Sequence, residues 1–223
     1  MTYRRELGTL LNTETETDLQ SLVQTSDTAS YFLGICHGAG AIYRLKDGTT
    51  IFRLRGDKLD NEFYQKDVFP LAKRYLSENI KLNQDIKERM SKKEKYSVPV
   101  LHIASPNVLK IFQEYLGFPI GKKNKYSIPK LILNSNVSSK RFFLKGMIAT
   151  AGTIMIDKKK DYARVEFRDK PASLLEDIKS CFRSSYGINV SIGKTRASIK
   201  NGDAIKLYAE GAIVHPHHLS RFS

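Results

Sequence analysis

An internal repeat constrains the fold of this 223-residue chain more than any other feature of its sequence. Residues 32–40 (FLGICHGAG) and residues 144–152 (LKGMIATAG) share one pattern, apolar-x-Gly-apolar-apolar-x-small-Ala-Gly. Gly34 and Gly146 stand 112 residues apart, and so do Gly40 and Gly152, so the two segments align without a gap. A chain that carries such a segment twice is expected to fold as two similar halves.

Each segment predicts a closely packed helix that ends at a glycine. Gly34 and Gly38 are four residues apart and share one helical face, as do Gly146 and Thr150. Small residues at this spacing allow two helix backbones to approach each other closely. The final glycine of each segment fits a helix end that turns directly into a strand. One copy would be typical of an ordinary buried helix, whereas two copies predict a pair of crossing helices.

Similar elements follow each segment. After the first, residues 41–46 and 49–55 alternate on either side of an Asp-Gly turn, which is typical of a β-hairpin; a helix over 63–81, a strand over 96–104 and a helix over 106–116 follow. After the second, we predict strands over 153–156 and 162–167, a helix over 173–186 closed by Gly187, a hairpin over 188–192 and 196–200, and a short helix over 203–210. A similar order of secondary-structure elements therefore occurs twice in the chain.

Both segments resemble the LAGLIDADG motif of homing endonucleases in their monomeric two-repeat form. Residues 51–56 and 60–71, the joining stretches 117–123 and 127–130, and the ending 215–219 resemble corresponding parts of that family. The resemblance implies an α+β fold of two pseudo-symmetric αββαββα repeats, with the motif helices packed at the pseudo-two-fold axis and an antiparallel β saddle facing DNA. We expect an N-terminal extension over 1–28, a first repeat over 29–120, a basic connecting segment over 121–140 and a second repeat over 141–223.

The charge balance independently favours a polyanionic partner. Lys and Arg total 37 against 23 Asp and Glu, a net charge of +14. This surplus favours nucleic acid or an anionic membrane surface, although a basic surface can also serve solubility alone. No apolar run is long enough to span a membrane. Basic and polar residues alternate with apolar ones along the predicted strands, as strands that lie in a major groove require.

The residues predicted to contact DNA lie on these strands and on the connecting segment. Residues 115–156 contain seven Lys and Arg but no Asp or Glu, a composition that suits a phosphate backbone and equally suits a solvated linker. Arginines on strands would fork to guanine, whereas lysines at turns would touch phosphates. Glu166 is predicted on the same polar face as Arg164. The predicted contacts are Arg44, Lys46, Arg53, Arg55, Lys122, Lys123, Tyr162, Arg164, Lys194 and Arg196.

The positions that would cut DNA carry no acid. In the family that the chain resembles, the acidic residue before the final glycine of each motif holds divalent metal, and the matching positions are Ala39 and Ala151. Hydrolysis needs that metal, and magnesium needs hard oxygen ligands. His37 is a poor substitute, because imidazole binds magnesium weakly and the side chain lies about 200° around the helix from Ala39. The acids at hairpin turns, Asp47, Asp157 and Asp161, should lie away from the helix ends. We therefore predict no metal site, no cofactor and no catalytic residue.

The remaining cysteine and histidine residues favour no other class of site. Cys36 and Cys181 lie far apart in apolar runs, so we expect reduced core residues in an intracellular protein. His215, His217 and His218 cluster near the end of the chain without a partner at metal-ligand spacing.

The sequence thus favours a sequence-preferring double-stranded DNA-binding protein without nuclease activity, monomeric and nucleoid-associated when bound. Three alternatives stay open. The first is an intron-encoded maturase, which would prefer structured RNA. The second is an active endonuclease with a non-standard metal site, the one case in which Mg²⁺ would be required. The third is a structural or interaction protein that binds nucleic acid only through its charge.

Overall fold

The computed structural model describes residues 10, 13–77, 79–89, 94–121, 126–157, 159 and 162–222. Its first helix, α1 (Glu16–Thr25), lies within the predicted N-terminal extension. The Thr15 hydroxyl accepts from the Asp18 backbone N–H, while the Asp18 carboxylate accepts from the Thr15 N–H, which fixes the start of the helix. The helix buries Leu19, Leu22 and Val23, so this part of the extension joins the core.

The first half follows the predicted order. The motif helix α2 (Asp27–Ala39) turns at Gly40 into β1 (Gly40–Arg44), which pairs with β2 (Thr50–Arg55). One helical run follows, made of α3 (Asn61–Phe63), the π-helical turn η2 (Tyr64–Val68) and α4 (Phe69–Tyr75). The strands β3 (Leu82–Arg89) and β4 (Glu94–Ile103) complete an antiparallel sheet in the order β1-β2-β4-β3. The half ends with α5 (Pro106–Lys110) and the π-helical η3 (Ile111–Tyr115).

The second half repeats this order. After the short α6 (Lys130–Leu133), the motif helix α7 (Val137–Ala151) leads into β5 (Gly152–Asp157) and β6 (Tyr162–Arg168). The helix α8 (Ala172–Tyr186) ends at Gly187, whose φ of 66° is left-handed, as predicted for a glycine stop. With β7 (Ser191–Ile192) and β8 (Arg196–Lys200) the sheet order is β5-β6-β8-β7, and α9 (Gly202–Ala209) and α10 (Pro216–Leu219) follow. The predicted pair of αββαββα repeats is confirmed.

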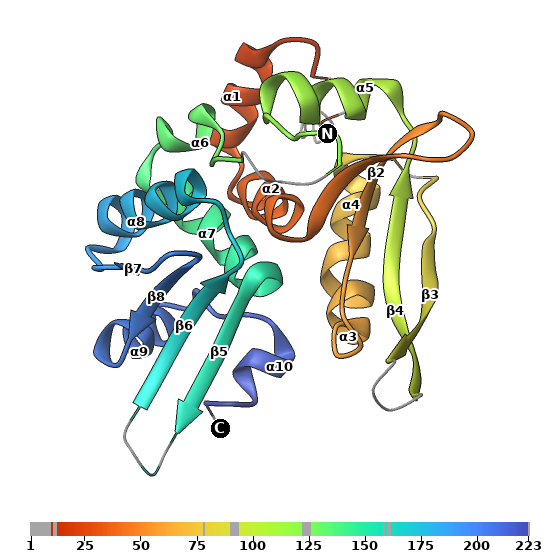
Figure 1. Cartoon of the computed structure of the whole chain (residues 1–223). Helices are drawn as coiled ribbons and strands as arrows, with labels where there is room; N and C mark the ends of the chain where they lie inside the picture. The colour runs from red at the N-terminus through yellow and green to blue at the C-terminus, as the bar shows by residue number, and fades with distance from the viewer. Residues whose placement is uncertain are drawn as a thin grey trace, which may run out of the picture.

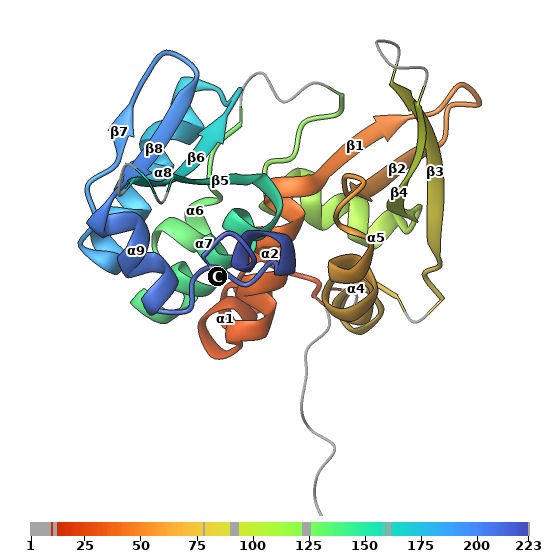
Figure 2. The same ribbon diagram turned by 90° about the horizontal axis from the view of Figure 1, so that it is seen from below.

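The two motif helices form the centre of the molecule. Helices α2 and α7 pack along each other between the two sheets (Figure 1). Viewed from below, the sheets lie along one side of the molecule, and α1, α4 and α9 lie on the opposite side (Figure 2). The sheet faces turned away from these helices therefore form the saddle that the fold class implies. No helix in the described part of the chain is long and apolar enough to cross a membrane.

The repeated glycines are the contact between the motif helices. A Cβ atom on Gly34 would overlap the Phe143 carbonyl oxygen of α7, and one on Gly146 would overlap the Tyr31 carbonyl oxygen of α2. The obstacles are backbone atoms, which cannot rotate away as a side chain can. The small residues thus set how closely the two halves approach, as the sequence pattern predicts.

Several element boundaries differ from the predictions. The strand β3 is not predicted, because residues 82–89 lack regular alternation and form an edge strand on which Ile86 is 77% exposed. The predicted helix over 63–81 ends at Tyr75, and the predicted strand over 188–192 is shortened to two residues. The short helices α6 and α10 are not predicted either, since four residues are too few to show helical periodicity.

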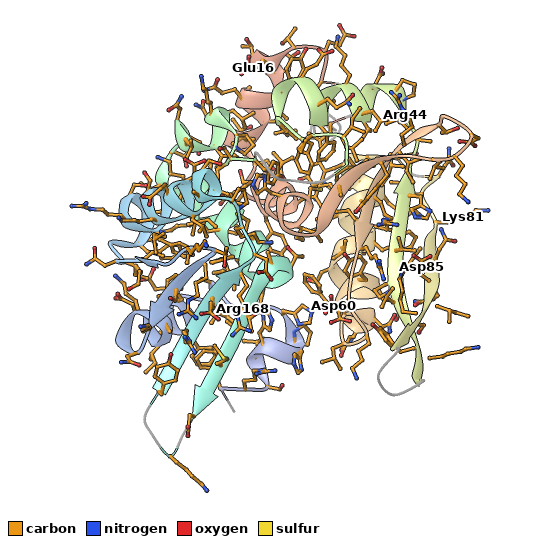
Figure 3. All side chains as sticks on the ribbon, viewed as in Figure 1. Glu16, Arg44, Asp60, Lys81, Asp85 and Arg168 are labelled. Carbon is orange, nitrogen blue, oxygen red and sulfur yellow. The ribbon has the colours of Figure 1, made fainter. Side chains whose placement is uncertain are left out.

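The C-terminal segment ties the second half to the first. His215 is buried, its ring lies 4.6 Å from that of Phe63, and its Nε2 atom lies 3.1 Å from an Asp60 carboxylate oxygen. Asp60 lies between α3 and α10 (Figure 3). Within the second half, Arg221 donates to the Ile154 carbonyl oxygen of β5 at 2.8 Å and holds the end of this segment. His215 therefore serves contact between the two halves.

This segment predicts a loss of stability in mild acid. Burial, with the neighbouring His215 and His217, lowers the pKa of His218 to about 4 from 6.5. Between these values the unfolded chain binds a proton that the folded chain does not, so stability falls as the pH drops from 6.5 towards 4, by up to about 3 kcal/mol. Urea unfolding across this range should show a weaker pH dependence for His218→Gln than for wild type. The exposed His102, replaced in the same way, is the control; equal pH dependence in all three proteins would contradict the prediction.

Candidate nucleic-acid interface

The first sheet presents a basic and aromatic face to the saddle. Arg53 lies opposite Ala41 and His102 in the register of the sheet, and its guanidinium carbon lies 4.3 Å from the centre of the Tyr43 ring. Arg55 shares this face two residues further along β2. Phe52 and Leu54 point the other way, into the core. Exposed His102, which the sequence patterns did not indicate, joins the predicted Arg53 and Arg55 here.

The second sheet carries a larger basic group. Ala163, Val165 and Phe167 of β6 are buried against the helices, so the alternate residues of β6 face the saddle. The register places β8 residues directly opposite them. The residues on this face are Tyr162, Arg164, Glu166 and Arg168 from β6 and Arg196, Ser198 and Lys200 from β8. Arg168 continues the predicted alternation by one position on β6 and Lys200 by two positions on β8, so the sequence pattern contained a signal for both that the prediction did not use.

Two predicted contacts on the first hairpin lie apart from this face. Arg44 pairs with Thr50 and has the same orientation as Ile42 and Phe52, which point towards the helices. It is exposed at the end of β1 (Figure 3). Lys46 lies in the turn beyond. The alternation along the hairpin was predicted correctly, and Arg53 and Arg55 share the saddle face, but on β1 Tyr43 rather than Arg44 lies with Arg53.

The other predicted lysines are Lys194, Lys122 and Lys123. Lys194 is exposed in the turn between β7 and β8, where the Gly193 N–H donates to the Arg196 carbonyl oxygen at 2.8 Å. Lys122 and Lys123 lie outside the described residues. Arg141, on α7 just after the connecting segment, has structural partners: its Nε donates to the Ser185 carbonyl oxygen at 2.8 Å and its Nη1 lies 3.4 Å from the Glu210 carboxylate.

The motif helices end side by side at the middle of the saddle. A Cβ atom on Gly38 would lie 3.3 Å from the Cβ of Ala151, which places the end of α2 against the end of α7. Ala39 and Ala151 are both half-buried. A cavity of about 210 Å³ opens here, lined by Gly38 and Ala151 and by residues that include Asp169 and Lys170. Ala39 and Ala151 match the metal-binding acids of LAGLIDADG homing endonucleases, and they lie at adjacent helix ends, as the resemblance implies. Both carry a methyl group.

Asp169 and Lys170 are site residues that the sequence patterns did not reveal. Asp169 follows β6 with a left-handed φ of 53°, and Lys170 is partly buried beside it. Burial lowers the pKa of Lys170 from its usual value, although the Asp169 carboxylate acts in the opposite direction. The equivalent place in the first half belongs to Gly56, since Gly40 pairs with Leu54 as Gly152 pairs with Phe167. The cavity therefore contains a carboxylate from one half only.

The residues at the helix ends do not fit a divalent metal. In the part of the chain that the structure describes, no three His, Cys, Asp or Glu side chains converge at ligand distance. A single carboxylate beside a lysine is a poor magnesium site, since magnesium is held by several hard oxygen atoms. Asp47 is occupied in its hairpin turn, where it accepts from the Thr49 N–H at 2.9 Å, and Asp157 ends β5 opposite Tyr162. Asp161 lies outside the described residues.

His37 is part of the core rather than a ligand at the surface. It is 2% exposed, and the Tyr126 hydroxyl lies 2.6 Å from its Nδ1 atom. The two rings stack with their centres 4.1 Å apart, and Phe118 and Phe143 surround the imidazole. His37 thus anchors the joining region after Gly121 to the first motif helix.

Comparison with known proteins identifies the fold. No protein-family model matches the sequence, and no curated protein matches it significantly. Among solved structures, the chain is similar to the homing endonuclease I-DmoI in complex with DNA and calcium, with a TM-score of 0.54 and 16% identity over 88% of this chain and 97% of that one. It is also similar to an I-DmoI variant bound to its target DNA in the presence of magnesium, with a TM-score of 0.52 and 17% identity over 85% and 96% of the two chains.

The chain is also similar to a protein of another kind, DUF199/WhiA. Full-length DUF199/WhiA from Thermatoga maritima matches with a TM-score of 0.52 and 14% identity, over 94% of this chain and 65% of that one. The chain therefore has the two-repeat LAGLIDADG fold, as the motif pair indicated. Structural similarity at identities this low establishes the fold alone. The activity has to be argued from this chain's own residues.

Proposed function

We propose that this protein binds double-stranded DNA in the saddle formed by its two sheets, prefers one long asymmetric sequence, and does not cut it. The observation that carries the proposal is the pair of basic faces on the saddle, one on each sheet. Arginine, lysine, tyrosine and histidine side chains face one concave surface, while the apolar residues of the same strands are buried. The net charge of +14 and the DNA-bound relatives of the same fold support the same partner.

The preference for an asymmetric sequence is supported by differences between the two sheets. Arg53 and Glu166 occupy equivalent places, because they lie opposite Ala41 and Thr153, the first residues after each motif glycine. An arginine in one half and a glutamate in the other would not read the same base edges. A protein with two similar halves and unlike reading faces is expected to select a site whose halves also differ.

The proposed lack of cleavage is supported by Ala39 and Ala151. Without a carboxylate at either helix end, the centre of the saddle lacks the ligands that would hold magnesium against the scissile phosphates. Asp169 is the one acid that lines the neighbouring cavity among the described residues, and it contributes from a single half.

The alternatives differ in what they should bind. A maturase would prefer structured RNA over the matching duplex. An active endonuclease would select a duplex and then break it when magnesium is added. A protein that binds only through its charge would bind all duplexes equally. We further propose that the protein acts as a monomer inside the cell, because its two repeats already supply both halves of the saddle.

The test is a selection of random duplex DNA on the purified protein at near-physiological salt without divalent metal, followed by incubation of the enriched sequences with magnesium. We expect one long asymmetric site, an affinity that falls steeply with rising salt, and intact DNA after magnesium is added. Cleaved DNA would overturn the proposed inactivity. A failure to enrich any duplex, with binding of structured RNA instead, would overturn the proposed partner.

A further inference from the structure

The second sheet contains a carboxylate that is buried beneath arginines on the saddle side. Glu166 lies on β6, one of the two inner strands of the sheet, and its side chain faces the saddle, yet that side chain is 0% exposed. A buried carboxylate is costly unless charged partners surround it. Three arginines do so here. Arg168 donates through Nε to Glu166 Oε2, and the Nη1 atoms of Arg164 and Arg196 lie 3.4 Å and 3.8 Å from Oε1.

The three arginines are held at their inner edges and remain accessible from the saddle. Their side chains are 23% exposed for Arg164, 52% for Arg168 and 60% for Arg196. The sulfur of Met155 also lies 3.9 Å and 3.7 Å from the Nη2 atoms of Arg164 and Arg168. Each guanidinium has five N–H donors, and Glu166 engages one nitrogen atom of each. Arg164 Nε is buried, but the more exposed Arg168 and Arg196 retain unused donors for a ligand.

The cluster has the properties of a prearranged reading surface. Three guanidinium groups and one carboxylate leave a net charge of +2. Long arginine side chains lose rotamer freedom on binding, and anchoring them beforehand reduces that loss. A forked arginine recognises the O6 and N7 acceptors of guanine only when its plane is correctly oriented. In the first sheet, Arg53 occupies the position equivalent to Glu166 and packs over the Tyr43 ring. That position therefore has no carboxylate to hold arginines in place.

We propose that Glu166 is a positioning residue for base recognition: it holds the three surrounding arginines as one donor array that reads guanine in the half of the DNA site under the second sheet. This inference rests on the proposed DNA-binding function. Glu166 itself does not touch the DNA; it acts through the orientation of the arginines.

The experiment compares Glu166→Gln with wild type on the selected duplex and on a scrambled duplex of equal length. The substitution keeps the side-chain shape and raises the charge of the cluster from +2 to +3. We expect the specificity ratio, selected over scrambled affinity, to fall at least tenfold, while scrambled affinity stays equal or rises. Repeating the selection should show lost guanine preference in one half of the site and unchanged preference in the other. A purely structural role would instead lower the melting temperature and weaken both affinities together.

Two further variants complete the design. Glu62→Gln removes the same charge from an exposed acid on α3 that pairs with Lys66, so it should leave the specificity ratio unchanged. Arg196→Lys, at an exposed position that should not affect folding, keeps the charge and loses the fork; it should reduce guanine preference at one position of the same half-site. An unchanged ratio for both Glu166→Gln and Arg196→Lys overturns the inference while DNA binding stands. If the wild-type protein selects no duplex, both the proposed function and this inference are overturned.

Discussion

Replacing Gly146 by alanine is expected to lower the free energy of unfolding by at least about 3 kcal/mol, at the upper end of what an added methyl group costs in a packed core. A Cβ atom there would overlap the Tyr31 carbonyl oxygen and lie 2.7 Å from the Ile35 backbone nitrogen and 3.0 Å from the Gly34 carbonyl carbon. All of these atoms belong to the backbone of α2. The strain can be relieved only by moving one motif helix relative to the other, which breaks contacts along the whole centre of the molecule.

Urea unfolding of the purified variant measures the effect, and Gly202→Ala is the matched control. Gly202 is exposed at the start of α9, where an added Cβ meets nothing within 4 Å and φ is not left-handed. Its substitution should change the free energy of unfolding by less than about 1 kcal/mol. If the Gly146 variant were as stable as this control, the close approach of the two motif helices would be wrong.

A double substitution tests whether the two glycines act through one contact. Gly34→Ala should also destabilise, because its Cβ atom would overlap the Phe143 carbonyl oxygen from the other side. Once either methyl group has forced the helices apart, the second has more room. We therefore expect the double variant to lose clearly less stability than the sum of the two single losses, by more than about 0.5 kcal/mol.

The architecture was predictable because local and global signals in this sequence agree. The small residues at Gly34, Gly38, Gly146 and Thr150 are required by backbone contact, and such a requirement is visible as a repeated pattern. Alternation along β6 revealed which side chains share a face. The edge strand β3 escaped prediction because a strand paired on one side and largely exposed shows no regular apolar alternation.

The site was less predictable, because its properties depend on neighbours across strands. Glu166 was placed on the polar face of β6, but it is surrounded by Arg196 of the neighbouring strand β8 as well as by Arg164 and Arg168 of its own strand. Asp169 lines the cavity at the ends of the motif helices because its backbone is left-handed. The residues around it in the sequence do not predict that conformation. Pairing register and loop conformation are not readable from a single sequence, and both set which charges meet.

Restoring the missing acids is expected to weaken DNA binding about 100-fold in the absence of divalent metal. In Ala39→Asp with Ala151→Asp, two carboxylates would stand at the ends of α2 and α7, in the middle of the proposed DNA-binding saddle. A carboxylate roughly 6 Å from a phosphate, at an effective dielectric constant of about 40, is repelled by about 1.4 kcal/mol. Each repulsion corresponds to about a tenfold loss of affinity, and two such sites together to about 100-fold.

Magnesium should reverse this loss, because a divalent ion held between the new carboxylates and the phosphates changes repulsion into attraction. The measurement is the affinity for the selected duplex with a chelator and then with magnesium, for wild type and for the double variant. Wild type should respond weakly, as magnesium only screens its phosphate contacts. The double variant should recover most of its affinity, and DNA strand breaks in that sample alone would show that the alanines are what separates this chain from a nuclease.

The matched control is Ala39→Asn with Ala151→Asn, which adds nearly the same volume without charge. Steric interference alone would weaken the aspartate and asparagine variants equally, whereas electrostatic repulsion weakens only the aspartate variant and makes its loss dependent on salt. If the aspartate variant bound DNA as tightly as wild type in chelator, the phosphate backbone would not pass over the motif ends. The duplex would then have to lie on the sheets in another orientation, and Ala39 and Ala151 would carry no information about cleavage.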